Sequence, residues 1–468
     1  MTNEKLGGDN VTVRPPFEGL EGGSPDDGSV DESAKAGLLR GKISSIRAEM
    51  QVPLYRNAYL MMVNTALTSV LGFAYWFIAG NVYTEEEVGT SAALIQAMVL
   101  ISNIAQLNGA QILMRYVPVA GRTTRRLVTY TMILPSLASL VASVVALVGA
   151  HYLVADDNPL HMHWGLSVWF VISVVTWSLF NLQDAAFIGL RRVFWVPVDN
   201  TSFGVAKIIL LFPFLGLFAS TGIFISWTLP VLLSLFPLQY LLYRSFIPKH
   251  EAEATGDEPP IERSAVVRFV AWDYFGWMFA QAGGTIVPLL VVSVLGKQAN
   301  AYFYMPQIIA TAVDLFVTNL MTSLVVEASR DMEAVAHFSR LILRRVVTIV
   351  FPAVAIVIIA APLFFDILPG GYGEQGVSVL RILALATVPR VVIALSNSLS
   401  RVDQKTHQVA IVQGVQAVLI VGLSLWWMQD HGIDGAAAAV LAAPTIVALA
   451  LLPRLIMRLS PRFNRTTA

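Results

Sequence analysis

The stretch that decides the fold is VYTEEEVGTSAALIQAMVLISNIAQLNGAQILMRYVP, residues 82–118. After three glutamates it runs through residues 88–114 without any Asp, Glu, Lys or Arg, and it ends at an arginine. A helix that crosses a membrane needs about 20 mainly apolar residues, so this run predicts a membrane span near 88–112. Thr84 and Glu87 form the T-x-x-E pattern of a capping box, which predicts that the helix begins there.

The rest of the chain repeats this pattern. Further long runs without charge include residues 57–84, 127–155, 208–243 and 406–429. The 468 residues are 56% hydrophobic and 13% charged, and their mean hydropathy is +0.65. A soluble chain carries about 25% charged residues. The predicted fold class is therefore an all-α polytopic membrane protein.

Twelve transmembrane helices account for these runs if the 208–243 run is divided at its Ser/Thr/Gly break, 218–224. We expect them near 59–80, 88–112, 127–150, 164–188, 199–218, 222–243, 272–295, 301–325, 346–365, 378–400, 408–428 and 435–456. The charged, proline-containing segment 244–270 separates six spans from six. A 6+6 layout of this kind predicts two six-helix bundles that are parallel repeats of each other.

The orientation follows from Lys and Arg, in which cytoplasmic loops are enriched. With the N-terminus inside, 27 of the 31 Lys and Arg residues fall in inner segments. Lys297 and Arg381 fall outside, and Lys207 and Arg390 fall within spans. Both termini are therefore expected in the cytoplasm.

The same patterns divide the chain into five segments. They are a disordered acidic tail ending in a short amphipathic cytoplasmic segment (1–50), the N-terminal bundle (51–243), a cytoplasmic linker (244–270), the C-terminal bundle (271–458) and a cytoplasmic tail (459–468). The tail is polar and rich in Gly and Pro, as disordered segments are. Because residues 1–34 contain no apolar core, no signal peptide is expected there.

Several kinds of chemistry are excluded by the sequence. The chain contains no cysteine, which removes disulfides, thiol catalysis and cysteine-ligated metals. It also contains no HExxH, no GxxxxGK[ST] and no GxGxxG after a strand. We expect no catalytic residue, no cofactor, no metal and no nucleic-acid partner. Transport remains, with a membrane-embedded enzyme or a scaffold as alternatives.

Two local motifs carry a resemblance to a known family. The loop TEEEVG at 84–89, Gly109 and the motif RYVP at 115–118 resemble the first outer loop and second helix of polysaccharide flippases. These flippases belong to the multidrug/oligosaccharidyl-lipid/polysaccharide (MATE-like) export superfamily. In the second half, LPGGYGEQGVSVLRILALATVP at 368–389 is similar to the stretch that follows helix nine in that family.

The resemblance implies a flippase in a bacterial inner (plasma) membrane. Its substrate would be a polyprenyl-pyrophosphate-linked glycan, a cell-surface polysaccharide precursor, moved to the outer leaflet by ion-coupled alternating access. Membrane lipids and a polysaccharide polymerase or glycosyltransferases are the implied partners. Drug-exporting relatives often carry an acid in the first helix, and residues 57–84 carry none. A multidrug/cation antiporter and a membrane-embedded glycan ligase or transferase stay as alternatives.

Charged and polar groups within the spans are the candidate site residues, because a charge at the bilayer centre costs roughly 2.5–3.5 kcal/mol. A pyrophosphate needs cations, and arginine presents a planar fork of donors that suits phosphate oxygens. The substrate-binding candidates are Arg390, Lys207, Arg115, Asn103, Gln106 and Gln111. The candidates for ion coupling or a gate are Asp314, Asp184 and Asp273.

Each candidate also has a purely structural interpretation. Asp314 and Arg390 would neutralise each other if they paired, and Lys207 would reach the cytoplasmic surface if its long side chain extended there. Arg115 suits an anchor at the inner leaflet. Hydrogen bonds between helices explain the polar stripes of the second span as well as sugar binding does. The three glutamates are expected only to cap the second span and to complement its helix dipole.

Overall fold

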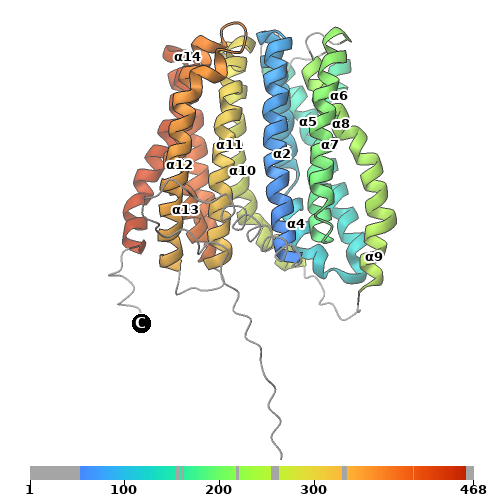
Figure 1. The fold of residues 1–468 in the computed structure, drawn as a ribbon. Helices are drawn as coiled ribbons and strands as arrows, with labels where there is room; N and C mark the ends of the chain where they lie inside the picture. Colours follow the sequence, from blue (N-terminus) through green and yellow to red (C-terminus); the bar gives the residue numbers. More distant parts are fainter. Residues whose placement is uncertain are drawn as a thin grey trace, which may run out of the picture. The chain divides into compact units, whose positions relative to one another are not determined.

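The computed structural model describes residues 53–153, 159, 163–217, 221–254, 263–328, 335–403 and 405–459 (Figure 1). The predicted tail at 1–50 and most of the predicted tail at 459–468 lie outside these ranges. The chain divides into two units, Met1–Tyr59 and Leu60–Ala468. Of the first unit only residues 53–59, the start of one helix, are described.

Every regular element in the described ranges is a helix, and none of them is a strand. The N-terminal half consists of α2 (Pro53–Val82), α3 (Glu85–Ala105), α4 (Gly109–Tyr116), α5 (Thr124–Leu153), α6 (Trp164–Gly189), α7 (Trp195–Leu217), α8 (Gly222–Leu241) and α9 (Ile247–Ala252). The C-terminal half consists of α10 (Arg263–Leu295), α11 (Lys297–Ala328), α12 (Val335–Phe365), α13 (Tyr372–Val402) and α14 (Thr406–Leu459).

Nine of the described helices are long and apolar enough to cross a membrane. One of them, His407–Met457, contains two predicted spans joined at Gly432, which has a positive φ of 56°. The described parts of α11 and α12 are not among the nine, although α12 contains the shorter apolar segment Val350–Phe365. The all-helical, multi-pass class is therefore supported, while the count of twelve and the orientation of the termini stay predictions.

The predicted span at 88–112 is wrong in one respect, because it is not a continuous helix. Leu107 and Asn108 have φ values of 50° and 58°, in the left-handed region that residues other than glycine rarely adopt. The chain therefore leaves α3 and starts a separate helix, α4. At this break the hydroxyl of Tyr274 in α10 donates to the carbonyl oxygen of Ile104 at 2.6 Å, so one of the carbonyls freed at the end of α3 keeps a partner.

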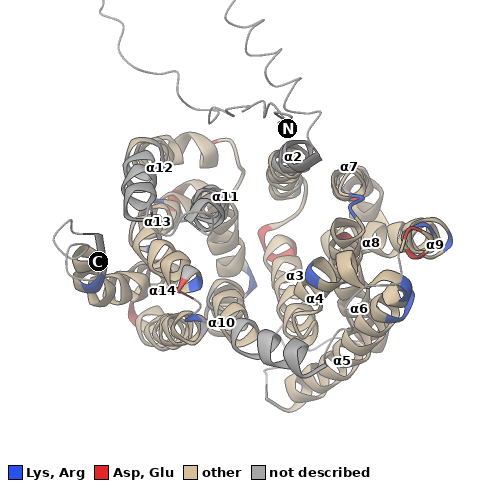
Figure 2. Cartoon of the chain, turned by 90° about the horizontal axis from the view of Figure 1, so that it is seen from below, with Lys and Arg blue, Asp and Glu red and all other residues tan. Residues whose placement is uncertain are grey.

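The two halves meet where α3 packs against α10 and α11 (Figure 2). Gly89 makes the closest approach, since a Cβ atom at this position would overlap the carbonyl oxygen of Lys297. Asn300 Nδ2 donates to the Gly89 carbonyl oxygen at 2.8 Å. The largest hydrophobic core spans both halves and includes Trp76 of α2 and Phe303 of α11. The packing of this core fixes the walls of the space described next.

Candidate functional site: a cavity between the two halves

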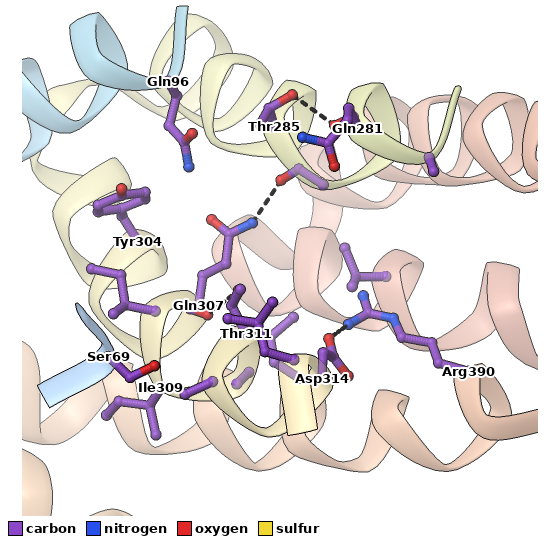
Figure 3. A pocket seen from close by; sticks show the side chains of 18 of the residues that line it. Ser69, Gln96, Gln281, Thr285, Tyr304, Gln307, Ile309, Thr311, Asp314 and Arg390 are labelled. Carbon is purple, nitrogen blue, oxygen red and sulfur yellow. Dashed lines mark hydrogen bonds and ion pairs between the residues drawn. The ribbon is translucent and has the colours of Figure 1, made fainter. Parts of the chain in front are cut away.

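A cavity of about 1120 Å³ lies between the N-terminal and C-terminal halves. It is slightly larger than the roughly 300–1,000 Å³ of most small-molecule sites. Trp76, Gln96 and Lys207 line it from the N-terminal half, and α10, α11, α13 and α14 line it from the C-terminal half. Figure 3 shows Gln281 and Gln307 beside this space. The cavity is therefore shared by helices that are far apart in the sequence.

Uncharged hydrogen-bonding groups dominate the polar part of the wall. Its six amide side chains are Gln96, Gln281, Gln307, Asn397, Gln413 and Gln416. Its aliphatic hydroxyl groups are Thr68, Ser69, Thr285, Thr311 and Ser398. Gln307 Nε2 donates to the carbonyl oxygen of Gly284 at 2.8 Å, whereas the Oε1 atoms of Gln307 and Gln416 accept no hydrogen bond from the described residues. The wall thus offers both donors and acceptors.

Arg390 and Asp314 form an ion pair on the cavity wall (Figure 3). Their side chains are 27% and 24% exposed. Thr387 Oγ1 donates to the second oxygen of the Asp314 carboxylate at 2.8 Å. From the sequence, an ion pair between these two residues and a position on the cavity wall were alternatives. In the structure the two residues form the ion pair and also line the cavity. The pair brings no net charge to the cavity.

Lys207 also lines the cavity but has a different environment. The residue is only 6% exposed, so its side chain does not extend to a surface. Its Nζ atom lies 4.6 Å from the ring centroid of Phe203, 5.0 Å from that of Tyr75 and 5.3 Å from that of Trp227. We call these three rings the aromatic box. Among the described residues no carboxylate lies within 4.0 Å of this ammonium group.

The other predicted substrate-binding residues are not brought to this cavity. Asn103 and Gln106 are buried near the end of α3, and Gln111 and Arg115 are exposed on α4; none of the four is part of the described cavity wall. The break between α3 and α4 separates the two pairs. Gln96, earlier on α3, does line the cavity.

The predicted acidic residues have three different outcomes. Asp314 is on the cavity wall. Asp184 lies between α6 and α7, where Asn200 Nδ2 donates to it at 2.7 Å and Gln183 Nε2 donates to the neighbouring Asp199 at 3.0 Å. Neither Asp184 nor Asp199 is part of the cavity wall as described. The side chain of Asp273 lies outside the described part of α10.

The capping box predicted from T-x-x-E is present at the start of α3. Thr84 N donates to Glu87 Oε2 at 2.8 Å, and Glu87 N donates to Thr84 Oγ1 at 3.4 Å. Burial, together with the Glu87 carboxylate, raises the pKa of the adjacent Tyr83 to about 12, so this phenol stays a donor to a backbone carbonyl of α7. Glu86 pairs with Lys297 at 3.4 Å.

The role of Glu85 was not visible in the sequence. Its carboxylate accepts hydrogen bonds from the Tyr302 hydroxyl, from Gln298 Nε2 at 2.5 Å and from the Gly371 N–H at 2.7 Å. We call these four residues the Glu85 cluster. The donors are more than 200 positions away in the chain, and no local pattern links them to the glutamates. The cluster connects the start of α3 to α11 and α13.

An apolar layer separates the Glu85 cluster from the cavity. Its side chains include Phe77, Met305 and Leu368, which surround a small void. Along α11, Tyr302 of the cluster is followed by Tyr304 of the cavity wall, Met305 of the layer and Gln307 of the cavity wall. The wall reaches Arg401 at the far end of α13. The cavity is thus closed at the end that carries the Glu85 cluster, which we call the closed end.

No protein-family model matches the chain, and neither does any curated protein. Solved structures do match. An inward-facing multidrug resistance MATE family transporter of the MOP superfamily is 13% identical, with a TM-score of 0.67 over 86% of this chain and 96% of that chain. The lipid II flippase MurJ in an inward closed conformation is 14% identical, with a TM-score of 0.66 over 85% and 87%.

An outward-facing MATE transporter of the same superfamily is 12% identical, with a TM-score of 0.56 over 88% of this chain and 95% of that chain. Identities this low show a shared fold, and the chain has the fold of MOP superfamily transporters. These solved structures are of transporters and a flippase, which are not enzymes. The resemblance drawn from 84–89, Gly109 and 115–118 is confirmed at the level of fold.

Proposed function

We propose that the protein is a transporter that moves a polyprenyl-pyrophosphate-linked glycan from the inner to the outer leaflet of a bacterial inner membrane. The observation that supports this most is the cavity wall, in which six amides and several hydroxyls surround about 1120 Å³. Sugar hydroxyls both donate and accept hydrogen bonds, as amides do. The wall therefore suits a glycan.

Alternating access is the mechanism that we propose for this transport. The halves meet along α3, α10 and α11, and the cavity between them is closed at one end. Transport requires that this end opens while the other closes. We propose coupling to an ion gradient, with Asp314 as the candidate group on the cavity wall, and cooperation with a polysaccharide polymerase or glycosyltransferases.

A multidrug or cation antiporter is the second candidate. The aromatic side chains of Trp76, Trp227 and Tyr304 on the cavity wall favour it, because aromatic faces attract organic cations. Two observations point the other way. The one described carboxylate on the wall, Asp314, is paired with Arg390, and the positive charge of Lys207 repels a cation.

Depletion of the protein in cells tests the two candidates. We expect lipid-linked glycan to accumulate in the inner leaflet, and the wild-type chain to restore its transfer. A Gln281→Leu/Gln307→Leu chain removes two wall amides and should fail to restore it. Gln111→Leu is the matched control, since Gln111 lies off the described cavity wall. Unchanged glycan in both leaflets, with lost resistance to cationic drugs, would establish the antiporter instead.

A further inference from the structure

The positively charged groups on the cavity wall differ in how their charge is compensated. Arg390 is paired with Asp314. Arg401 is exposed, at the end of α13. Lys207 is 6% exposed and meets only aromatic faces among the described residues. Over the described part of the wall, Lys207 is thus the buried charge that no carboxylate balances.

The aromatic box is held in place independently of Lys207. The Tyr75 hydroxyl donates to the carbonyl oxygen of Ile223 at 2.7 Å. The ring of Trp227 packs against that of Trp177, with 4.7 Å between their centroids. Since these contacts do not involve the lysine, the box is preformed and persists when the ammonium group moves.

Aromatic faces attract an ammonium group, but they offset only part of what it loses on leaving water. An oxyanion restores more of that loss, because a charge-assisted hydrogen bond is about twice as strong as a neutral one. The cavity beside Lys207 is large enough to admit such a group. An oxyanion that enters the cavity therefore stabilises the Lys207 ammonium group more than the aromatic rings do.

We propose that Lys207 anchors an oxyanion of the cargo on the N-terminal side of the cavity, leaving the aromatic box to do so. This inference rests on the proposed function and names the residue that holds the anionic group of the cargo. The oxyanion is the diphosphate of the lipid carrier or the carboxylate of an acidic sugar. Arg390 has less to gain from the same group because Asp314 already compensates it.

Binding to the full-length protein in lipid nanodiscs tests this assignment. The probes are farnesyl diphosphate against farnesol, and methyl glucuronide against methyl glucoside. We expect Lys207→Met to weaken binding of one anionic probe by about tenfold or more and to leave its uncharged counterpart unchanged. A loss of affinity for farnesyl diphosphate identifies the diphosphate as the anchored group. A loss of affinity for methyl glucuronide identifies the carboxylate.

Lys249→Met is the matched control, because it removes an exposed lysine of α9 outside the described cavity wall. Lys207→Gln gives the same comparison if the Met variant does not fold. Affinities of both anions within about twofold of wild type in the Lys207 variants would overturn the assignment, as would equal losses for charged and uncharged probes. Binding is measured without transport, so the two proposals can fail separately. If the Lys207 variants lose affinity for an anionic probe but depletion leaves the glycan in both leaflets unchanged, only the proposed function is refuted.

Discussion

Arg390 and Asp314 face each other on α13 and α11, in a part of the chain where either charge alone would be costly. Their pairing explains how both are tolerated inside an apolar region. Because about a quarter of each side chain is exposed, solvent screens the pair, and its strength lies below that of a fully buried one. The carboxylate is also held by Thr387, which fixes the geometry of the pair.

The first prediction concerns this pair. Asp314→Asn and Arg390→Gln each leave one charge without its partner, so each should lower the thermal midpoint of the purified protein. The double variant has no unpaired charge at this site. Its loss of stability should therefore be smaller than the sum of the losses in the two single variants. We expect a coupling free energy in the lower part of the range of about 0.5–3 kcal/mol, measured in a double-mutant cycle. Additive losses would mean that the two groups do not stabilise each other.

Residues of the cavity wall were predictable from the sequence where a charge interrupts an apolar run. This is why Lys207, Arg390 and Asp314 were identified before the structure was known. The amides of the wall, such as Gln281 and Gln307, carry no such signal, because a glutamine in a membrane helix faces a neighbouring helix as readily as a cavity. Only the packing of helices from both halves shows which amides share one space.

At the scale of the element, the sequence predicted where helices begin better than where they break. The T-x-x-E pattern placed the start of α3, and the structure has the capping box. The break before α4 was missed because the run 88–114 is uniformly apolar, although the Asn108–Gly109 dipeptide at that point is a turn signal. The Glu85 cluster was missed for another reason, since its donors come from distant helices.

The second prediction concerns the contact between α3 and the start of α11. Gly89→Ala places a methyl group on the carbonyl oxygen of Lys297, so the helices must separate. We expect a loss of about 1–3 kcal/mol, typical of overpacking, seen as a lower thermal midpoint. Gly72→Ala on α2 is the control, because an added Cβ there meets nothing within 4 Å. Equal midpoints for the two variants would refute the close approach.

At the scale of the whole molecule, the proposed alternating access requires that the cavity open to each side in turn. The cavity is separated from the closed end by the apolar layer and the Glu85 cluster. The transporter fold was foreseen from two motifs and the span pattern, whereas the closed end needed the three-dimensional contacts.

The third prediction concerns this closure. Glu85→Ala removes the acceptor of three hydrogen bonds that join the halves, so the closed end should open more often. The chain contains no cysteine, which makes a single Thr285→Cys on the cavity wall a background-free probe. Labelling by an impermeant maleimide from the side of the closed end should rise severalfold in sealed vesicles.

Glu374→Ala provides the control for this experiment. It also removes an acid from the first turn of a helix, α13, but Glu374 is exposed and is not part of the Glu85 cluster. A chain with Glu374→Ala and Thr285→Cys should be labelled as fast as a chain with Thr285→Cys alone. If Glu85→Ala behaves in the same way as this control, the cluster does not hold the end shut.

The break between α3 and α4 affects the free energy of any conformational change in which α4 moves. Leu107 and Asn108 in the left-handed region together cost about 2–4 kcal/mol, at about 1–2 kcal/mol per residue. A straightened segment would recover this amount and lose the hydrogen bond from Tyr274 to Ile104, which contributes about 0.5–1.5 kcal/mol. The difference is about 0.5–3.5 kcal/mol in favour of straightening, so the hydrogen bond to α10 offsets only part of the backbone cost of the bent segment. Movement of α10 would release it and redirect α4 without a large barrier from the backbone itself.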